Sequence, residues 1–219
     1  MGEEYYDKKF FRWQKEIGSF GGIDDLHKFE AYIGKTDDIL DFGCGGGYLL
    51  KNIRTSGHKT GVEINENAKK TVIKNGVEYH RYIEEVADCS VDIVISHMAL
   101  EHVEHPAHCL REMKRVIRPG GKIVVVVPHE ILQKTGSGDT DMHLYTWSPQ
   151  HMKNLMEFCG IRCVFSKRYP YLWPPGYRSF QRIFGWRAFR AVSILYGAIR
   201  RIYFTKAVGI VEKPECSKN

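Results

Sequence analysis

The sequence lacks the marks of membrane-spanning, secreted and zinc-stabilised proteins. No apolar run in its 219 residues approaches the roughly 18 that a membrane span needs. The first residues, MGEEYYDKKF, are charged and contain no apolar core of a signal peptide. The six cysteines include no C-x-x-C pair, which argues against a zinc site and indicates reduced thiols packed as small apolar side chains. We therefore expect a cytoplasmic protein.

Acidic residues are missing from one long segment of the chain. No Asp or Glu lies between Phe158 and Val211, although ten Lys and Arg residues lie there. The whole chain carries a formal net charge of +6, so the rest of the sequence is net negative. Positive charge concentrated in one segment indicates an anionic partner for that segment.

What the chain does contain is an alternation of apolar, β-branched runs with helical patterns. Strands are expected at 37–42, 59–64, 77–82, 91–96, 122–128, 161–167 and 206–213, and helices at 48–54, 67–74, 106–117 and 148–160. This order predicts a doubly wound α/β sheet, whose ligands bind beyond the carboxyl ends of the parallel strands. Residues 1–36 are expected to form a helical cover in front of this domain, which spans 37–219.

The stretch ILDFGCGGGYLL, from Ile39 to Leu50, carries the strongest functional signal. An apolar strand reaches an acid at Asp41, turns through four glycines within five residues and resumes as a helical pattern. Glycines there let a ligand touch the backbone, and the N–H groups at the start of the helix favour anionic atoms. Glu63 ends the second strand 22 residues after Asp41, where a carboxylate typically takes the ribose hydroxyls of a nucleoside.

The spacing of the glycines distinguishes two classes of cofactor. The dinucleotide pattern G-x-G-x-x-G, counted from Gly43, would need a glycine where Tyr48 stands. The pattern present is D-x-G-x-G-x-G, formed by Asp41, Gly43, Gly45 and Gly47. An acid before the glycines repels a pyrophosphate but suits a cationic amino-acid group. The sequence therefore predicts a nucleoside that carries a positively charged amino-acid tail, namely S-adenosylmethionine.

Together with GVEIN, VDIVISHMALEHV and LREMKRVIRPGGKIVVVVP, this stretch resembles the class I S-adenosylmethionine-dependent methyltransferases of the broad type 11 kind. The LEHV run is most similar to that of ubiquinone-biosynthesis O-methyltransferases. The resemblance covers about residues 37–167 and returns at the last strand. It implies a Rossmann-like, seven-stranded, mostly parallel sheet with the last strand antiparallel.

The resemblance also implies roles for individual residues. Asp41 would order the turn, Glu63 would hold the ribose, and the end of the fourth strand would lie under the methionine and the methyl group. The cofactor-binding residues implied in this way are Asp41, Gly43, Cys44, Gly45, Gly47, Glu63, Ile64, Tyr82, Ile83, Ser96 and His97. The family's usual acid for the adenine amino group has no match in HRYIEEV, where Tyr82, Ile83 or Glu84 could substitute for it.

Three interpretations remain open for the histidines that follow the expected strand ends. In the first, Glu101 and His102 only pack and cap the start of the next helix. In the second, His102, His129 or His143 is the general base that removes a proton from the methyl acceptor. In the third, a metal is bound. Some relatives hold a divalent ion through E-x-x-E-H, but Met98 takes the place of the first acid, which leaves only a soft ion on His102 with His129 or His143. We predict no metal.

An insertion is expected at residues 168–205, between the sixth and seventh strands. Because the sixth strand is parallel, the insertion leaves the sheet at the ligand-binding edge, where a substrate-binding lid belongs. A helix is expected from about Ser179. Its apolar residues share one face at helical spacing: Phe180, Ile183, Phe184, Ala191, Ile194, Leu195, Ala198 and Ile202.

This basic, aromatic lid has three interpretations. Its helix could pack on the domain while the arginines are solvated. It could instead form a basic amphipathic surface for an anionic membrane or a lipid-linked anionic acceptor. Arginines interleaved with aromatic residues also suit single-stranded nucleic acid, but no RNA-binding module accompanies them.

The sequence as a whole predicts an S-adenosylmethionine-dependent methyltransferase. The expected reaction is O-methylation of a small or lipid-linked acceptor, such as a sugar of a surface polysaccharide. The alternatives are a quinone-type or natural-product acceptor, and a non-catalytic subunit that binds S-adenosylmethionine. The expected location is the cytoplasm, with peripheral contact to the inner face of the membrane as an option.

Overall fold

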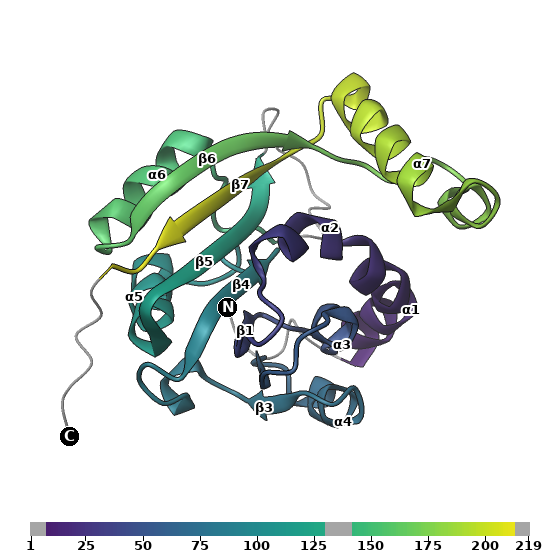
Figure 1. Cartoon of the computed structure of the whole chain (residues 1–219). Helices are drawn as coiled ribbons and strands as arrows, with labels where there is room; N and C mark the ends of the chain where they lie inside the picture. Colours follow the sequence, from purple (N-terminus) through teal and green to yellow (C-terminus); the bar gives the residue numbers. More distant parts are fainter. Residues whose placement is uncertain (1–7, 130–141, 213–219) are drawn as a thin grey trace.

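The computed structural model describes residues 8–129 and 142–212, and within them seven strands form one sheet (Figure 1). The spatial order is β3-β2-β1-β4-β5-β7-β6. The strands are β1 (Ile39–Phe42), β2 (Lys59–Val62), β3 (Glu78–His80), β4 (Val91–His97), β5 (Ile117–His129), β6 (Arg162–Pro170) and β7 (Tyr203–Ile210). Only β7 runs antiparallel to its neighbours, β5 and β6. The predicted fold is confirmed.

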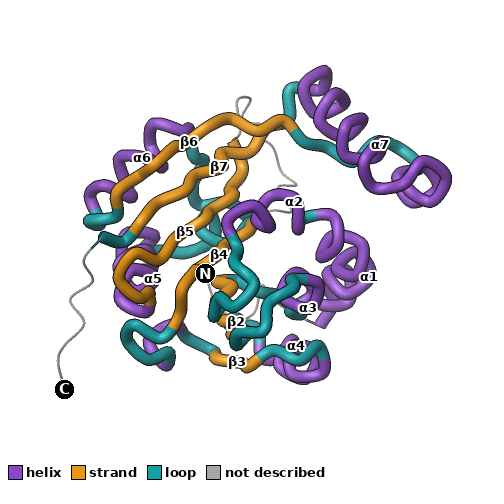
Figure 2. Tube along the Cα trace, in the orientation of Figure 1, coloured by secondary structure: helices purple, strands orange, loops and turns teal. Residues whose placement is uncertain are grey.

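Helices lie on both sides of this sheet (Figure 2). They are α1 (Lys8–Asp24), α2 (Leu26–Phe29), α3 (Tyr48–Asn52), α4 (Lys69–Lys74), α5 (Pro106–Val116), α6 (Pro149–Phe158) and α7 (Tyr177–Arg200), with short 3₁₀ turns η1 (Glu30–Tyr32), η2 (Glu66–Ala68) and η3 (Ile83–Glu85). Proline opens both α5 and α6, where its missing N–H costs no helical hydrogen bond. The Ser148 side chain caps α6 by accepting from the backbone N–H of His151.

The core consists of two layers, one on each side of the sheet. Along β5, Ile123, Val125 and Val127 belong to the cluster that contains the apolar residues of α5 and α6. Val124 and Val126 belong to the other cluster, which contains apolar residues of α2, α3 and α4. Because both faces are buried, this strand reads as an unbroken run of apolar residues.

The N-terminal cover and the C-terminal insertion pack against each other. The Phe20 ring of α1 contacts the rings of Trp173, Trp186 and Phe189, with centroids 4.9 to 5.4 Å apart. Strands β6 and β7 run farther than expected, so the insertion proper is residues 171–202 and not 168–205. Two segments from opposite parts of the chain thus form one roof at the carboxyl ends of the strands.

The expectation of reduced thiols holds for the four cysteines Cys44, Cys109, Cys159 and Cys163, which are free. It is wrong for Cys89, which is disulfide-bonded. Cys89 lies half-buried at a turn with a backbone φ of +47°, so it is not packed into the apolar core as a buried thiol would be.

Candidate functional site

Two adjoining cavities lie at the carboxyl ends of the strands. The larger has a volume of about 800 Å³ and is lined by residues of α1, α2, the glycine turn and the segment 171–173. The smaller has a volume of about 450 Å³ and is lined by residues that follow β2 and β3 and by the start of α5. Gly43, Met98 and His102 line both cavities, so the two spaces meet just beyond the end of β4.

The glycine turn forms the wall between β1 and the larger cavity. Gly43 has a backbone φ of +79°, and a Cβ there would lie 2.4 Å from the Cβ of Ala99. Both the left-handed conformation and the close approach of the next loop therefore require glycine at position 43. The backbone N–H groups of Gly43 and Cys44 both donate to the carbonyl of Val62, at 2.9 and 3.0 Å, which fixes the turn against β2.

Asp41 is a buried acid at the larger cavity. Its side chain is 3% exposed, and its Oδ1 atom accepts no hydrogen bond from the described residues. Burial, with the nearby carboxylates of Glu63 and Asp25, raises the pKa of Asp41 to about 8. A cationic group placed beside this oxygen would supply the missing partner and favour the ionised carboxylate.

Glu63 stands at the smaller cavity, at the end of β2. Its two carboxylate oxygens accept from the backbone N–H groups of Gly45, at 2.8 Å, and Asn65, at 2.9 Å. Burial raises its pKa, although these two hydrogen bonds act in the opposite direction. Each oxygen keeps a further lone pair, so the carboxylate is held in place and can still accept from two ribose hydroxyls.

The remaining wall of the smaller cavity suits a flat aromatic base. Ile64 is 41% exposed and Tyr82 is 43% exposed, and both line the cavity. Ile83 is buried beneath them, while Glu84 pairs with His108 through a 2.9 Å contact. All three substitutes considered for the adenine contact, Tyr82, Ile83 and Glu84, thus reach this wall.

Two of the predicted cofactor-binding residues lie outside both cavities. The Ser96 hydroxyl donates to the carbonyl of Phe42 at 3.1 Å and is fully buried, so it ties β4 to β1 and does not lie under the methionine as expected. Gly47 has a backbone φ of +71° and precedes α3, where it shapes the turn from inside the fold. Cys44 and Gly45, by contrast, line the larger cavity as predicted.

His97, at the end of β4, lies in the larger cavity next to a charged pair from α2. The Lys28 ammonium lies 2.7 Å from Asp25 and 2.9 Å from the Nε2 atom of His97. Burial lowers the pKa of His97 to about 4, and the charge of Lys28 lowers it as well. The carboxylate of Asp25 raises this pKa, but not enough to compensate. His97 is therefore neutral, and its Nε2 atom accepts from Lys28.

Sequence reasoning missed Asp25 and Lys28. Lys28 is only 3% exposed and lies about 5 Å from the centres of the Tyr171 and Phe204 rings. The available signal was a charged pair at i and i+3 in the segment IDDLHKF, which also contains Asp24 and His27. A charged pair at this spacing is also typical of a solvated helix face. Only the packing of α2 onto the sheet edge shows that this pair is buried.

His102, His143 and the buried Glu101 form one cluster at the junction of the cavities. The two imidazole rings have centroids 5.0 Å apart, and a carboxylate oxygen of Glu101 lies 4.0 Å from the Nε2 atom of His102. The backbone N–H of Leu144 donates to the carbonyl of Glu101 at 2.8 Å. This hydrogen bond brings the segment with His143 back to the loop after β4, so the structure places two of the three predicted bases together.

The same three side chains have the composition of a metal site. Each offers one ligand atom, and the three atoms lie within 4.8 Å of one another. Two imidazoles and one carboxylate suit ions such as Zn²⁺ or Fe²⁺ better than Mg²⁺. Met98 offers no oxygen in place of the first acid of E-x-x-E-H. Metal binding is therefore the alternative interpretation of this cluster, and a general base is the predicted one.

His129, the third predicted base, lies apart from this cluster. Its Nδ1 atom is 3.0 Å from the carbonyl of Trp147, and the ring lines neither cavity. The expectation that it faces the acceptor is not met, because β5 extends through His129 and pairs it with Tyr203 of β7. Strand pairing that continues past the predicted end of β5 turns this side chain away.

These features fit the predicted cofactor. The smaller cavity joins a carboxylate for the ribose to an apolar wall for the base. The junction leads past the glycine turn to the Asp41 oxygen that accepts no hydrogen bond within the described part of the chain, where the ammonium of an amino-acid tail would lie. The residues that would hold S-adenosylmethionine are thus Asp41 at the larger cavity, Glu63 and Ile64 at the smaller one, and Gly43, which lines both.

Known methyltransferases match this chain in sequence. A family model described as a methyltransferase domain matches residues 40–125. The chain is 32% identical over 148 residues to the ubiquinone biosynthesis O-methyltransferase of Aeromonas salmonicida, covering 56% of this chain and 62% of that protein. It is 30% identical over 195 residues to the protein of the same name from Saccharophagus degradans, covering 71% and 82%.

The chain spans 62%, 57% and 39% of the length of the ubiquinone biosynthesis O-methyltransferases of Aeromonas salmonicida, Nitrosococcus oceani and Sodalis glossinidius. Among solved structures, an S-adenosylmethionine-dependent methyltransferase from Aquifex aeolicus is similar with a TM-score of 0.59 at 17% identity. That similarity covers 92% of this chain and 98% of the other. At such low identity the structural similarity shows a shared fold.

Proposed function

Because the chain belongs to the class I S-adenosylmethionine-dependent methyltransferases, we propose that it methylates an oxygen atom of a small or lipid-linked acceptor, such as a sugar of a surface polysaccharide. The observation that carries the proposal is the position of His102, which lines both cavities and has His143 beside it and the buried Glu101 behind it. A base at this junction serves an acceptor that must lose a proton.

The chain's own residues divide the work between the two cavities. When bound, S-adenosylmethionine would supply an electrophilic methyl group, and its sulfonium sulfur would leave as a neutral thioether. Glu63 would hold the ribose and Asp41 the ammonium, on either side of the junction that Met98 and His102 line. Holding donor and acceptor in this alignment supplies most of the rate enhancement that such a displacement needs.

The base is the imidazole of His102 or His143. The carboxylate of Glu101 lies close enough to stabilise the positive charge that develops when an imidazole takes the acceptor's proton. His97 is unsuited to this role, since its Nε2 atom is 2.9 Å from the ammonium of Lys28 and burial lowers its pKa. This arrangement suits a hydroxyl acceptor, because its oxygen must lose a proton as the bond to carbon forms.

The larger cavity suits an acceptor with a flat or apolar body. Its outer wall consists of Tyr171, Leu172, Trp173, Ile202 and Phe204. Aromatic faces bind the apolar faces of sugar rings as well as planar rings. A quinone-type acceptor is therefore the second candidate, and it is supported by the sequence similarity to ubiquinone biosynthesis O-methyltransferases.

The test is methyl transfer from labelled S-adenosylmethionine into cell extract that is then separated into lipid, glycan, small-molecule, nucleic-acid and protein fractions. Glu63→Ala serves as the blank. Label in the lipid or glycan fraction supports the first candidate, and label in a quinone supports the second. Label only in nucleic acid or protein contradicts both. No label, with cofactor binding intact, would favour a non-catalytic subunit.

A further inference from the structure

After Gly185, whose φ and ψ are not helical, α7 is buried along one face. Phe189, Ser193 and Gly197, each four residues apart, are its buried residues. The carbonyl of Ser193 accepts from the backbone N–H of Leu172 at 3.1 Å, and a Cβ on Gly197 would lie 2.5 Å from the backbone of Tyr171. This close approach fixes which face of α7 points inward.

The opposite face of α7 is apolar and exposed. We use the name outer face for the exposed apolar residues Ile194, Leu195 and Ile199, together with Ile183 and Phe184, which precede the break in α7 at Gly185. The side chains of Ile183, Leu195 and Ile199 are 72%, 62% and 68% exposed. Ile183, Phe184, Ile194 and Leu195 belong to the apolar stripe expected from the sequence, and Ile199 does not. Their exposure is the reverse of what a helix packed by its apolar stripe would show.

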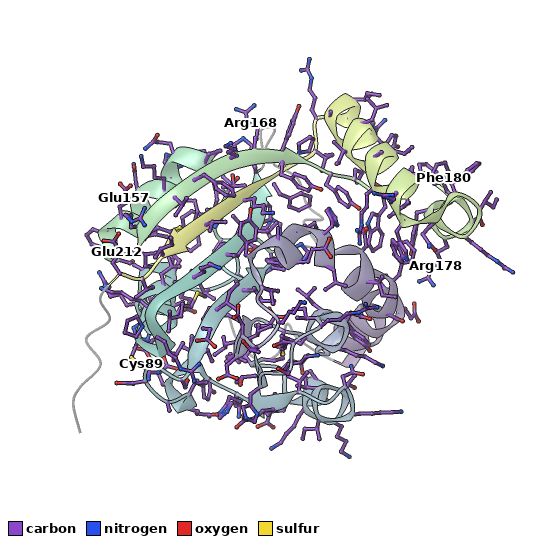
Figure 3. All side chains as sticks on the ribbon, in the orientation of Figure 1. Cys89, Glu157, Arg168, Arg178, Phe180 and Glu212 are labelled. Carbon is purple, nitrogen blue, oxygen red and sulfur yellow. The ribbon has the colours of Figure 1, made fainter. Side chains whose placement is uncertain are left out.

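Positive charge surrounds the outer face. Arg182, Arg187, Arg200 and Arg201 are exposed, and no acidic residue occurs between Phe158 and Val211. Arg178 and Phe180 extend from the first part of α7, and Arg168 extends from the nearby end of β6 (Figure 3). Exposed apolar side chains flanked by cations complement an anionic lipid surface, where the side chains enter the interface and the cations meet the headgroups.

The outer face also leads toward the site. Ile202 follows α7 directly, is 42% exposed and lines the larger cavity. Figure 1 shows α7 at the margin of the molecule, beyond the ends of β6 and β7. None of the helices among residues 8–129 and 142–212 is long and apolar enough to cross a membrane, so contact here would be with the surface of the bilayer.

We propose that the outer face of α7 docks on an anionic phospholipid surface and presents the mouth of the larger cavity to acceptors carried there. The purpose of docking, which is the capture of a lipid-borne acceptor, rests on the proposed function. Docking itself needs neither cofactor nor acceptor. The arginines attract the protein to the surface, and the apolar side chains hold it there.

The experiment is sedimentation of the full chain with vesicles of phosphatidylglycerol and phosphatidylcholine in equal parts, at low and high salt. Wild-type protein should bind these vesicles at low salt and bind neutral phosphatidylcholine vesicles at least about tenfold more weakly. Replacing both Leu195→Asp and Ile199→Asp should weaken binding by about tenfold or more, because two apolar side chains leave the interface and two charges oppose it. Arg182→Glu with Arg187→Glu should weaken it by a similar factor.

The matched control is Ile73→Asp on α4, since Ile73 is also exposed, at 56%, and lies outside the insertion. It should bind vesicles as wild type does. The proposal is overturned if wild type ignores anionic vesicles at low salt, or if the Leu195 and Ile199 variant binds as well as wild type. Binding of single-stranded RNA without binding of vesicles would overturn it too. Methyl transfer to an acceptor freed from lipid is measured separately, so failure of docking and failure of the proposed function are distinguishable.

Discussion

The hydroxyl of Tyr171 donates to the carboxylate of Asp24 at 2.7 Å, joining residues that are 147 positions apart. Asp24 is fully buried and also accepts from the indole N–H of Trp173 at 2.7 Å. Burial and this carboxylate raise the pKa of Tyr171 well above its usual range, so the hydroxyl keeps its proton and remains a donor. One acid at the end of α1 thereby connects the cover to the insertion.

Removing this hydroxyl should loosen the roof over the larger cavity. Tyr171→Phe leaves an oxygen of Asp24 with one donor fewer in a buried place, which costs on the order of 1–3 kcal/mol. We expect a lower Tm and faster hydrogen exchange in α1 and α7. The control is Tyr145→Phe, which removes a surface hydrogen bond to the carbonyl of Glu104 and should change the Tm little. Equal effects of the two changes would contradict a specific connection.

Replacing Glu63 should weaken cofactor binding. Glu63→Gln keeps the shape but loses the charge that favours ribose hydroxyls as donors, and charge-assisted hydrogen bonds are worth about 1.5–3 kcal/mol. We expect the Kd for S-adenosylhomocysteine, measured by calorimetry, to rise at least about tenfold. Glu78→Gln on β3, where the side chain is exposed and pairs with His80, serves as the control. An unchanged Kd for the Glu63 variant would remove the assigned ribose site.

Asp41 should make the ligand-free protein less stable as the pH rises. Its pKa is about 8 when folded, against 3.8 for the unperturbed side chain. Between these values the unfolded chain ionises while the folded chain stays protonated, so the free energy of the unfolded state falls relative to that of the folded state as the pH increases. Asp41→Asn should match wild type near pH 4 and exceed its Tm by about 10 °C or more at pH 8. A Tm difference that does not grow with pH would show that burial does not hold this proton.

The cluster at the junction should control the rate of methyl transfer. His102→Ala or His143→Ala, whichever removes the base, should lower kcat by about 10²–10⁴-fold while the Kd for S-adenosylhomocysteine stays within about twofold. His129→Ala should leave kcat near that of wild type, since its ring lines neither cavity. A loss of kcat in the His129 variant alone would reverse the assignment.

Removal of divalent ions should leave the activity unchanged. Met98 supplies no oxygen where metal-binding relatives have an acid, and the base needs only its Glu101 neighbour. Activity is measured after dialysis against a chelator. If activity disappears and added Zn²⁺, Fe²⁺ or Mn²⁺ restores it, the cluster of Glu101, His102 and His143 is a metal site and not a free base.

Local signals were enough to predict the sheet and the glycine turn. Strand β5 reads as a valine run because both of its faces are buried, and Gly43 is required by its own φ and by Ala99. Contacts between distant segments were not predictable. Lys28 carries no local sign that α2 lies over the cavity, and His129 turns away because β7 extends to pair with it. The outer face of α7 was found as a stripe, but only its packing shows that it points to solvent.

The distance along the chain between Asp24 and Tyr171 has a consequence for synthesis on the ribosome. At a translation rate of roughly 5–20 residues per second, Tyr171 and Trp173 are synthesised on the order of 10–30 seconds after Asp24. During that time the sheet lacks β6 and β7, and the surface of α1 that will meet Trp173 is uncovered. A chaperone or a neighbouring nascent chain therefore has its best opportunity there, and the roof closes only after the last strand has been translated.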